Sequence, residues 1–155
     1  MEKIRIAVAG AGTIGRRHIE EIRKSRDAKL AAIIDPSPAA NDIAHGEGVR
    51  VYASLDECLA RVRPDGVVLA TPNHLHVVQA LQCVAAGVPV LVEKPLAHTL
   101  EEGQRLVDAA ERACAKLLVG HHRRHSPILH EALAIVQSSI LGQIVAVLGI
   151  AVFCK

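Results

Sequence analysis

The residues of this chain that could do chemistry follow short apolar runs. A turn with the spacing GxGxxG, residues 10–15, follows Ile4–Ala9 and precedes Arg16–Lys24, which is predicted to be a helix. In such a turn the first glycine permits a tight bend, the second lets the backbone approach a diphosphate, and the third lets helix and strand pack closely. Free N–H groups at the start of the helix would then point at the anion. The residues expected to contact a dinucleotide here are Gly10, Gly12, Thr13, Ile14 and Gly15.

An acidic residue stands where such a site uses one. Asp35 follows the apolar run Leu30–Ile34, about twenty residues after Gly15, where a carboxylate would hydrogen-bond the adenosine ribose. A carboxylate there repels a 2′-phosphate and no arginine follows it directly, so NAD is favoured over NADP, although Arg16 or Arg17 could oppose this. The alternative is a polar loop that caps the next helix.

Two further polar segments follow apolar runs. Residues 71–76 (TPNHLH) come after Gly66–Ala70, and residues 93–95 (EKP) come after Val88–Val92. Ligands of open parallel sheets bind in the crevice outside the carboxyl ends of the strands. Lys94 would there donate to a substrate oxygen or pass a proton. The alternatives are a helix cap at Asn73 and a surface Glu–Lys pair.

A cluster of histidines lies in residues 120–127 (GHHRRHSP). These histidines precede a helix rather than share one of its faces, and no cysteine or carboxylate joins them at ligand spacing, so no metal site is predicted. We expect His122 and Arg123 to line the cofactor or substrate crevice. Four other histidines are interpreted as surface or packing residues: His18, His45, His98 and His130.

The elements that must position these residues alternate along the chain. Strand-length runs rich in Val, Ile and Leu alternate with segments of helical period, and Ser54 with Glu57 and Thr99 with Glu102 fit the capping box that begins a helix. This alternation predicts right-handed βαβ units and an α/β fold with a doubly wound parallel sheet, the Rossmann fold. Beside the four runs named above, strands are expected at Leu117–Gly120 and, more weakly, Val49–Tyr52.

Composition excludes several classes of protein. Of 155 residues, 50% are hydrophobic and 1% aromatic, and the net charge is +2. This composition excludes intrinsic disorder and argues against a base-stacking nucleic-acid surface. The four cysteines have no paired spacing and are expected to be reduced and buried. The start of the sequence shows no signal-peptide pattern, so a cytoplasmic location is expected.

The last part of the sequence is uncharged between Glu131 and Lys155, but polar residues interrupt it. We expect a helix from Ser126, a turn at Gly142 and a strand Ile144–Cys154 rather than a membrane span. The expected domains are therefore a dinucleotide-binding domain, residues 1–125, and residues 126–155, the linking helix and only the first strand of a second α/β domain. A self-associating fragment, in which this strand pairs with its copy, is an alternative.

Four motifs in order, GAGTIG, ATPNHLH, VEKPLA and VGHHRRHSP, resemble the glucose–fructose oxidoreductase, inositol dehydrogenase and rhizopine-catabolism (Gfo/Idh/MocA) family. The resemblance implies a nicotinamide-dependent oxidoreductase of sugars, cyclitols or related hydroxy compounds. It further implies that Lys94 assists proton transfer, that Glu93 contacts the nicotinamide ribose, that a cis peptide bond precedes Pro95, and that His122 contacts cofactor or substrate. The residues that match the family's cofactor loop are Thr71, Pro72, Asn73 and His76.

Members of this family carry a second domain that covers the nicotinamide and usually forms the oligomer interface, so the resemblance implies a homo-oligomer. Because that domain's substrate wall is missing, we expect this chain to bind NAD with little turnover. The competing hypothesis is a non-catalytic dinucleotide sensor or regulatory module. The expected partner is a small polyol or sugar, with no nucleic acid and no membrane.

Overall fold

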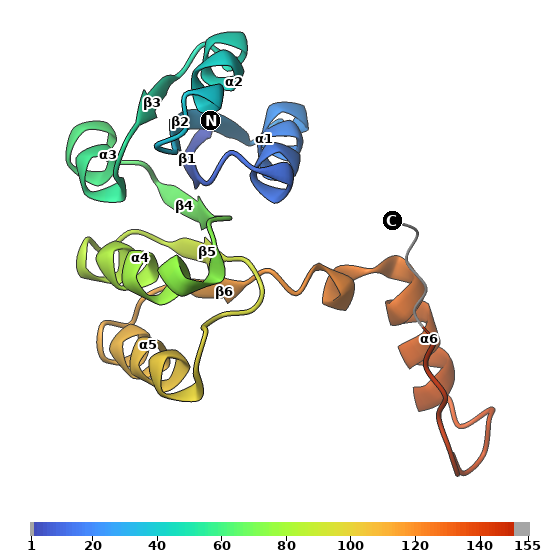
Figure 1. The fold of residues 1–155 in the computed structure, drawn as a ribbon. Helices are drawn as coiled ribbons and strands as arrows, with labels where there is room; N and C mark the ends of the chain where they lie inside the picture. The colour runs from blue at the N-terminus through green and yellow to red at the C-terminus, as the bar shows by residue number, and fades with distance from the viewer. Residues whose placement is uncertain (1, 151–155) are drawn as a thin grey trace. The chain divides into compact units, whose positions relative to one another are not determined.

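The computed structural model describes residues 2–150, and residues 2–120 contain a six-stranded parallel sheet with the strand order β3-β2-β1-β4-β5-β6 (Figure 1). The strands are β1 (Ile4–Ala9), β2 (Ala28–Ile34), β3 (Arg50–Tyr52), β4 (Gly66–Leu69), β5 (Val90–Val92) and β6 (Leu117–Val119). The connecting helices are α1 (Thr13–Lys24), α2 (Ala39–Glu47), α3 (Leu55–Val62), α4 (Asn73–Ala85) and α5 (Leu100–Arg112). The predicted doubly wound α/β fold is confirmed.

The central strands are continuous apolar runs because both of their faces are buried. Successive side chains point to opposite faces, so Ala7 and Ala9 of β1 belong to one apolar cluster and Val8 to another. The first cluster includes buried side chains of α3, α4 and α5, and the second includes those of α1 and α2. The helices therefore cover the two faces in two groups, as right-handed connections in both directions from β1 require.

Two of the predicted helix starts are capped as expected. The hydroxyl oxygens of Ser54 and Thr99 accept hydrogen bonds from the backbone N–H groups of Glu57 and Glu102 at 3.3 and 3.2 Å. The alternative role for Asn73 as a helix cap is wrong. Asn73 is the first residue of α4, where it is already helical, and it follows Pro72 at the capping position.

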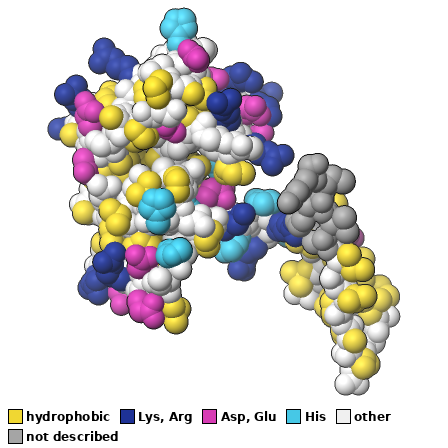
Figure 2. Space-filling model, viewed as in Figure 1, with side chains coloured by type: hydrophobic (Ala, Val, Ile, Leu, Met, Phe, Trp, Pro, Cys, Tyr) yellow, Lys and Arg dark blue, Asp and Glu magenta, His cyan; other side chains and the backbone are white. Residues whose placement is uncertain are grey.

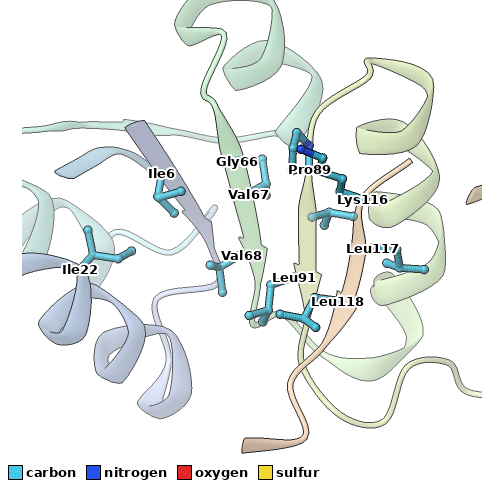
Figure 3. A pocket seen from close by; sticks show the side chains of 11 residues that line it. Ile6, Ile22, Gly66, Val67, Val68, Pro89, Leu91, Lys116, Leu117 and Leu118 are labelled. Carbon is cyan, nitrogen blue, oxygen red and sulfur yellow. The ribbon is translucent and has the colours of Figure 1, made fainter. Parts of the chain in front are cut away.

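The face of β4, β5 and β6 opposite α4 and α5 carries an apolar hollow of about 370 Å³ (Figure 3). Side chains of Val68, Leu91 and Leu118 lie along it, and Ile22 of α1 also lines it. Among the described residues that line it, Lys116 is the one that is charged. The hollow lies along the strands rather than at their carboxyl ends, so it is separate from the predicted site.

The cysteines divide into two kinds. Cys58 and Cys83 are buried, as predicted, and burial raises their pKa values to about 11 and about 12. The same prediction is wrong for Cys114, which is exposed in the turn after α5. Cys154 lies outside the described residues.

The chain divides into two compact units, with the second beginning at His121, a few residues before the expected boundary at residue 125. The second unit contains a 3-10 helix, His122–His125, and α6 (Pro127–Gln137), which confirms the predicted helix. Gly142 lies in a turn, as expected, with its N–H donating to the carbonyl of Ser139 at 3.0 Å. No helix of residues 2–150 is long and apolar enough to cross a membrane.

The strand expected from Ile144 to Cys154 is not formed over its described part. Residues 144–150 have no regular secondary structure, and residues 151–154 lie outside the described residues. A strand needs a neighbour for its N–H and C=O groups, and none of the described strands pairs with residues 144–150. The assignment of residues 126–155 to a second domain stays a prediction.

Candidate functional site

The predicted site residues of the first unit meet at one edge of the sheet. The chain leaves β1 toward β2 and β3 on one side, and returns through β4 to β5 and β6 on the other. Between β1 and β4 the strand order therefore reverses, and the loops that follow these strands open a crevice. The glycine-rich turn follows β1, Asp35 follows β2, Thr71 comes after β4 and Glu93 follows β5.

The three glycines of the turn are each explained by their surroundings. Gly10 has a φ of +89°, and a Cβ there would lie 2.5 Å from the carbonyl oxygen of Ala70. A Cβ on Gly15 would lie 1.7 Å from the carbonyl oxygen of Gly10, so only hydrogen permits this approach of α1 to the turn. A Cβ on Gly12 would meet nothing within 4 Å. The space beside Gly12 is therefore open, and a diphosphate could approach the backbone there.

The beginning of α1 faces this space. Gly12 precedes the helix in an extended conformation, and within the described structure no side chain caps it and no acidic residue lies in its first turn. Thr13 and Ile14, in that first turn, are exposed. A helix start with free N–H groups and no competing carboxylate binds anions through those groups and the helix dipole. The turn therefore fits the diphosphate of a dinucleotide.

Asp35 is fixed against the glycine-rich turn. Its carboxylate accepts a hydrogen bond from the Ala11 N–H at 2.7 Å through Oδ2 and one from the Ser37 N–H at 2.8 Å through Oδ1. Each carboxylate oxygen retains a second lone pair for a ribose hydroxyl. A hollow of about 260 Å³ adjoins this carboxylate, lined by Asp35, Pro36, Ser37, Pro38, Asn41, Val51 and Ala53. The second strand therefore ends in a half-buried acid beside a cavity, the arrangement expected for the adenosine end.

His76 ties two loops of the site together. Its side chain is 1% exposed, with Nε2 at 2.9 Å from the carbonyl oxygen of Thr71 and Nδ1 at 2.8 Å from that of Pro95. The Thr71 hydroxyl donates to the Gln79 amide oxygen at 2.6 Å. His76 therefore lies between the loop after β4 and the loop after β5, and each N–H that its ring carries donates to one of these two carbonyls. Direct contacts of Thr71, Pro72, Asn73 and His76 with a cofactor stay predictions.

Glu93 and Lys94 leave β5 in different environments. The Glu93 side chain is 14% exposed, and Oε1 lies 2.9 Å from His18 Nε2 of α1. Lys94 is exposed at the open edge and is followed by a cis peptide bond to Pro95, as the resemblance implied. The interpretation of His18 as an ordinary packing residue missed its contact with Glu93. Its signal in the sequence was the position three residues after Gly15, which puts it on the same face of α1.

His122 and Arg123 are not part of the first unit. Both lie exposed in the 3-10 helix of the second unit, so their contact with a cofactor or substrate stays a prediction. Within residues 2–150, no group of three or more His, Cys, Asp or Glu side chains could hold a metal ion. Figure 2 shows basic and acidic side chains interspersed over the visible face of the first unit.

The fold and the site together define a class of protein. A glycine-rich turn after the first strand, an acid after the second, and polar loops at the reversal of a 3-2-1-4-5-6 sheet are the parts of a dinucleotide-binding Rossmann domain. Residues 4–121 match the family model described as "Oxidoreductase family, NAD-binding Rossmann fold", GFO_IDH_MocA. The chain belongs to the Gfo/Idh/MocA family and carries its NAD-binding domain, which confirms the predicted family and cofactor.

Individual relatives support the same conclusion. The chain is 32% identical over 93% of its length to the rhizopine catabolism protein MocA of Rhizobium meliloti, of which it covers 45%. It superposes on the WlbA dehydrogenase from Bordetella pertussis in complex with NADH and UDP-GlcNAcA with a TM-score of 0.86, at 34% identity, covering 92% of this chain and 42% of that one. The scyllo-inositol dehydrogenase from Lactobacillus casei with bound NAD(H) and scyllo-inositol gives a TM-score of 0.86 at 28% identity, covering 91% and 43%. This chain thus spans less than half the length of these relatives.

Proposed function

We propose that this chain serves as the NAD-binding part of a dehydrogenase that oxidises a sugar, a cyclitol or a related hydroxy compound. The observation that carries the proposal is the placement of Glu93 and Lys94 at the same sheet edge as the glycine-rich turn. Support also comes from relatives solved with NADH or NAD(H) beside UDP-GlcNAcA or scyllo-inositol.

Each site residue has a separate role in binding the cofactor or the substrate. The free N–H groups at the start of α1 bind the diphosphate, and the Asp35 carboxylate accepts hydrogen bonds from the adenosine ribose. NAD, when bound, supplies the acceptor for the hydride that leaves the substrate carbinol carbon. Lys94 is exposed directly after β5 at this edge of the sheet, and we expect its amine to accept the proton of the substrate hydroxyl. Glu93 holds the nicotinamide ribose.

The wider properties of the protein follow from the same family. We expect a small polyol or sugar as the substrate, a homo-oligomer, and a cytoplasmic location. His122 and Arg123 are expected to contact the substrate or cofactor. Because the chain spans less than half the length of the relatives described above, we expect substantial turnover to need a second domain of the kind that the family resemblance implies.

Cofactor choice gives the first test. We expect NADH to bind more tightly than NADPH, by roughly tenfold or more, since the fixed Asp35 carboxylate would face a 2′-phosphate. Fluorescence titration of the chain with each nucleotide measures both affinities. Tighter NADPH binding would contradict the role of Asp35, and no binding of either nucleotide would refute the proposal itself.

The alternative, a non-catalytic dinucleotide sensor, is separated from a dehydrogenase by Lys94→Ala in a full-length version of the protein that includes the second domain implied by the family. In an enzyme this variant retains NADH binding within about twofold, since Lys94 does not contact the diphosphate, but loses NAD-dependent oxidation of a panel of inositols and sugars by a factor of roughly a hundred or more. A sensor would show no oxidation in either form. Lys116→Ala, in the hollow away from the carboxyl edge, is the matched control.

A further inference from the structure

The pair formed by His18 and Glu93 connects two parts of the site that the chain places far apart. His18 lies in the second turn of α1, the helix whose beginning faces the diphosphate, and Glu93 directly follows β5. Their Nε2 and Oε1 atoms are 2.9 Å apart, and the side chains are 26% and 14% exposed. Because an ionised carboxylate only accepts hydrogen bonds, the ring Nε2–H donates.

The Glu93 carboxylate is confined on three sides. Oε1 meets His18, and Oε2 accepts a hydrogen bond from the backbone N–H of Lys94 at 3.2 Å. On the third side is Gly120, where an added Cβ would lie 2.9 Å from Oε1 and 3.1 Å from Oε2. The Glu93 side chain therefore meets all three neighbours in the conformation that it adopts. Of these, His18 supplies the one side-chain hydrogen bond given by the described residues.

The strand order shows which end of a dinucleotide Glu93 would meet. Asp35, after β2, marks the adenosine side, and the glycine-rich turn after β1 marks the diphosphate. β4 and β5 lie on the opposite side of β1 from β2. A dinucleotide bound across the reversal of strand order therefore places its second half, the nicotinamide nucleoside, beside Thr71 and Glu93.

We propose that His18 is a positioning residue for the nicotinamide end of the site: it orients the Glu93 carboxylate without contacting the cofactor itself. This inference rests on the proposed function, because it takes the second half of the dinucleotide to be nicotinamide riboside. A pair of this exposure contributes little to folding stability, so its main effect is on the direction of the carboxylate.

The test compares two ligands that share the adenosine and diphosphate. NADH contains the nicotinamide riboside and ADP lacks it, so a change confined to the nicotinamide end alters the affinity for NADH alone. For His18→Ala we expect NADH to bind about tenfold more weakly, the loss typical of one charge-assisted hydrogen bond, and ADP to bind within about twofold of the original protein. His18→Gln places an amide N–H near the position of the ring Nε2 and should restore most of the NADH affinity.

Two further variants isolate the path through Glu93. In a Glu93→Ala background, His18→Ala should have no additional effect on NADH binding, because the two changes remove the same interaction. Glu20→Gln, on an exposed position of α1, is the matched control and should alter neither ligand's affinity. Circular dichroism melting of each variant shows that it is folded.

The outcomes separate clearly. Equal weakening of NADH and ADP by His18→Ala would show that His18 supports the packing of α1, and would overturn the inference. Unchanged NADH binding would overturn it as well. If the original protein bound ADP but gained no affinity from the nicotinamide riboside of NADH, the inference would fail while binding of the adenosine diphosphate part stood. If it bound neither ligand, the proposed function would fail.

Discussion

Gly12 and Gly15 lie in the same turn, but alanine should have opposite consequences at the two positions. At Gly15 the added Cβ would lie 1.7 Å from the carbonyl oxygen of Gly10, although such contacts are not found below about 3 Å. The Cβ is attached to the backbone of α1 and the carbonyl belongs to the backbone of the turn, so no side chain can move aside. The helix and the turn must therefore separate. At Gly12 the added Cβ meets nothing within 4 Å, and the φ of −70° suits any residue.

The magnitudes follow from these surroundings. Overpacking of this kind costs about 3 kcal/mol or more, and the better helix propensity of alanine at Gly15 returns at most about 1 kcal/mol. We therefore expect Gly15→Ala to lower the melting temperature by roughly 5–10 °C. Gly12→Ala should alter the free energy of unfolding by less than about 1 kcal/mol. Its methyl group occupies the space for the diphosphate, and the loss of one or two backbone contacts lowers NADH affinity by roughly 10- to 100-fold.

Two measurements on each variant test this reasoning. Circular dichroism melting gives the stability, and fluorescence titration with NADH gives the affinity. Gly46→Ala, in α2 with open space around its Cβ position, is the control for a glycine replaced elsewhere. Normal NADH binding by Gly12→Ala would refute the assignment of the open space to the diphosphate. A Gly15→Ala protein as stable as the original would refute the argument from close approach.

Two other predictions concern buried groups. His76→Phe should lower the free energy of unfolding in urea by about 1–3 kcal/mol, because a phenyl ring cannot donate a hydrogen bond to the carbonyl of Thr71 or of Pro95. A loss below about 0.5 kcal/mol would show that His76 does not hold the loops. In a Cys154→Ser background, Cys114 should react with Ellman's reagent at pH 8 within minutes. Cys58 and Cys83 should stay unreactive until urea unfolds the protein, since burial raises their pKa values to about 11 and about 12 and leaves little thiolate; rapid labelling of all three would contradict this.

The elements of the first unit were predictable because each is encoded locally. Short apolar runs predicted five strands and, more weakly, the sixth, β3, which contains Arg50. Ser54 and Thr99 predicted two helix starts whose caps the structure confirms. The prediction of a strand at Ile144–Cys154 was wrong for residues 144–150, because apolar composition shows that a segment can be buried but not that a neighbouring strand is present. The prediction that Cys114 is buried was wrong for a similar reason. It follows the apolar face of α5, but the helix ends at Arg112, which leaves the cysteine in a turn.

The contacts within the site were harder to predict because they join loops after different strands. Asp35 could be placed from its distance to the glycines, since that spacing reflects the length of one βαβ unit. The sequence also places His76 near the cofactor loop, but its bond to the carbonyl of Pro95 depends on where the chain turns after β5. No local sequence pattern predicts the direction of the chain after β5.

His18 shows how such a contact could be inferred. It lies 75 residues from Glu93 in sequence, so spacing alone does not pair them. However, Gly15 must face the turn and β4, and Ile19 lies in the apolar core, so the residue between them at helical spacing also faces inward. An inward-facing histidine on α1 needs a polar partner at the edge of the sheet, and the loops after β4 and β5 are the nearest candidates. Of the residues in those two loops, Glu93 is the one carboxylate, so the pairing follows once the strand order is known.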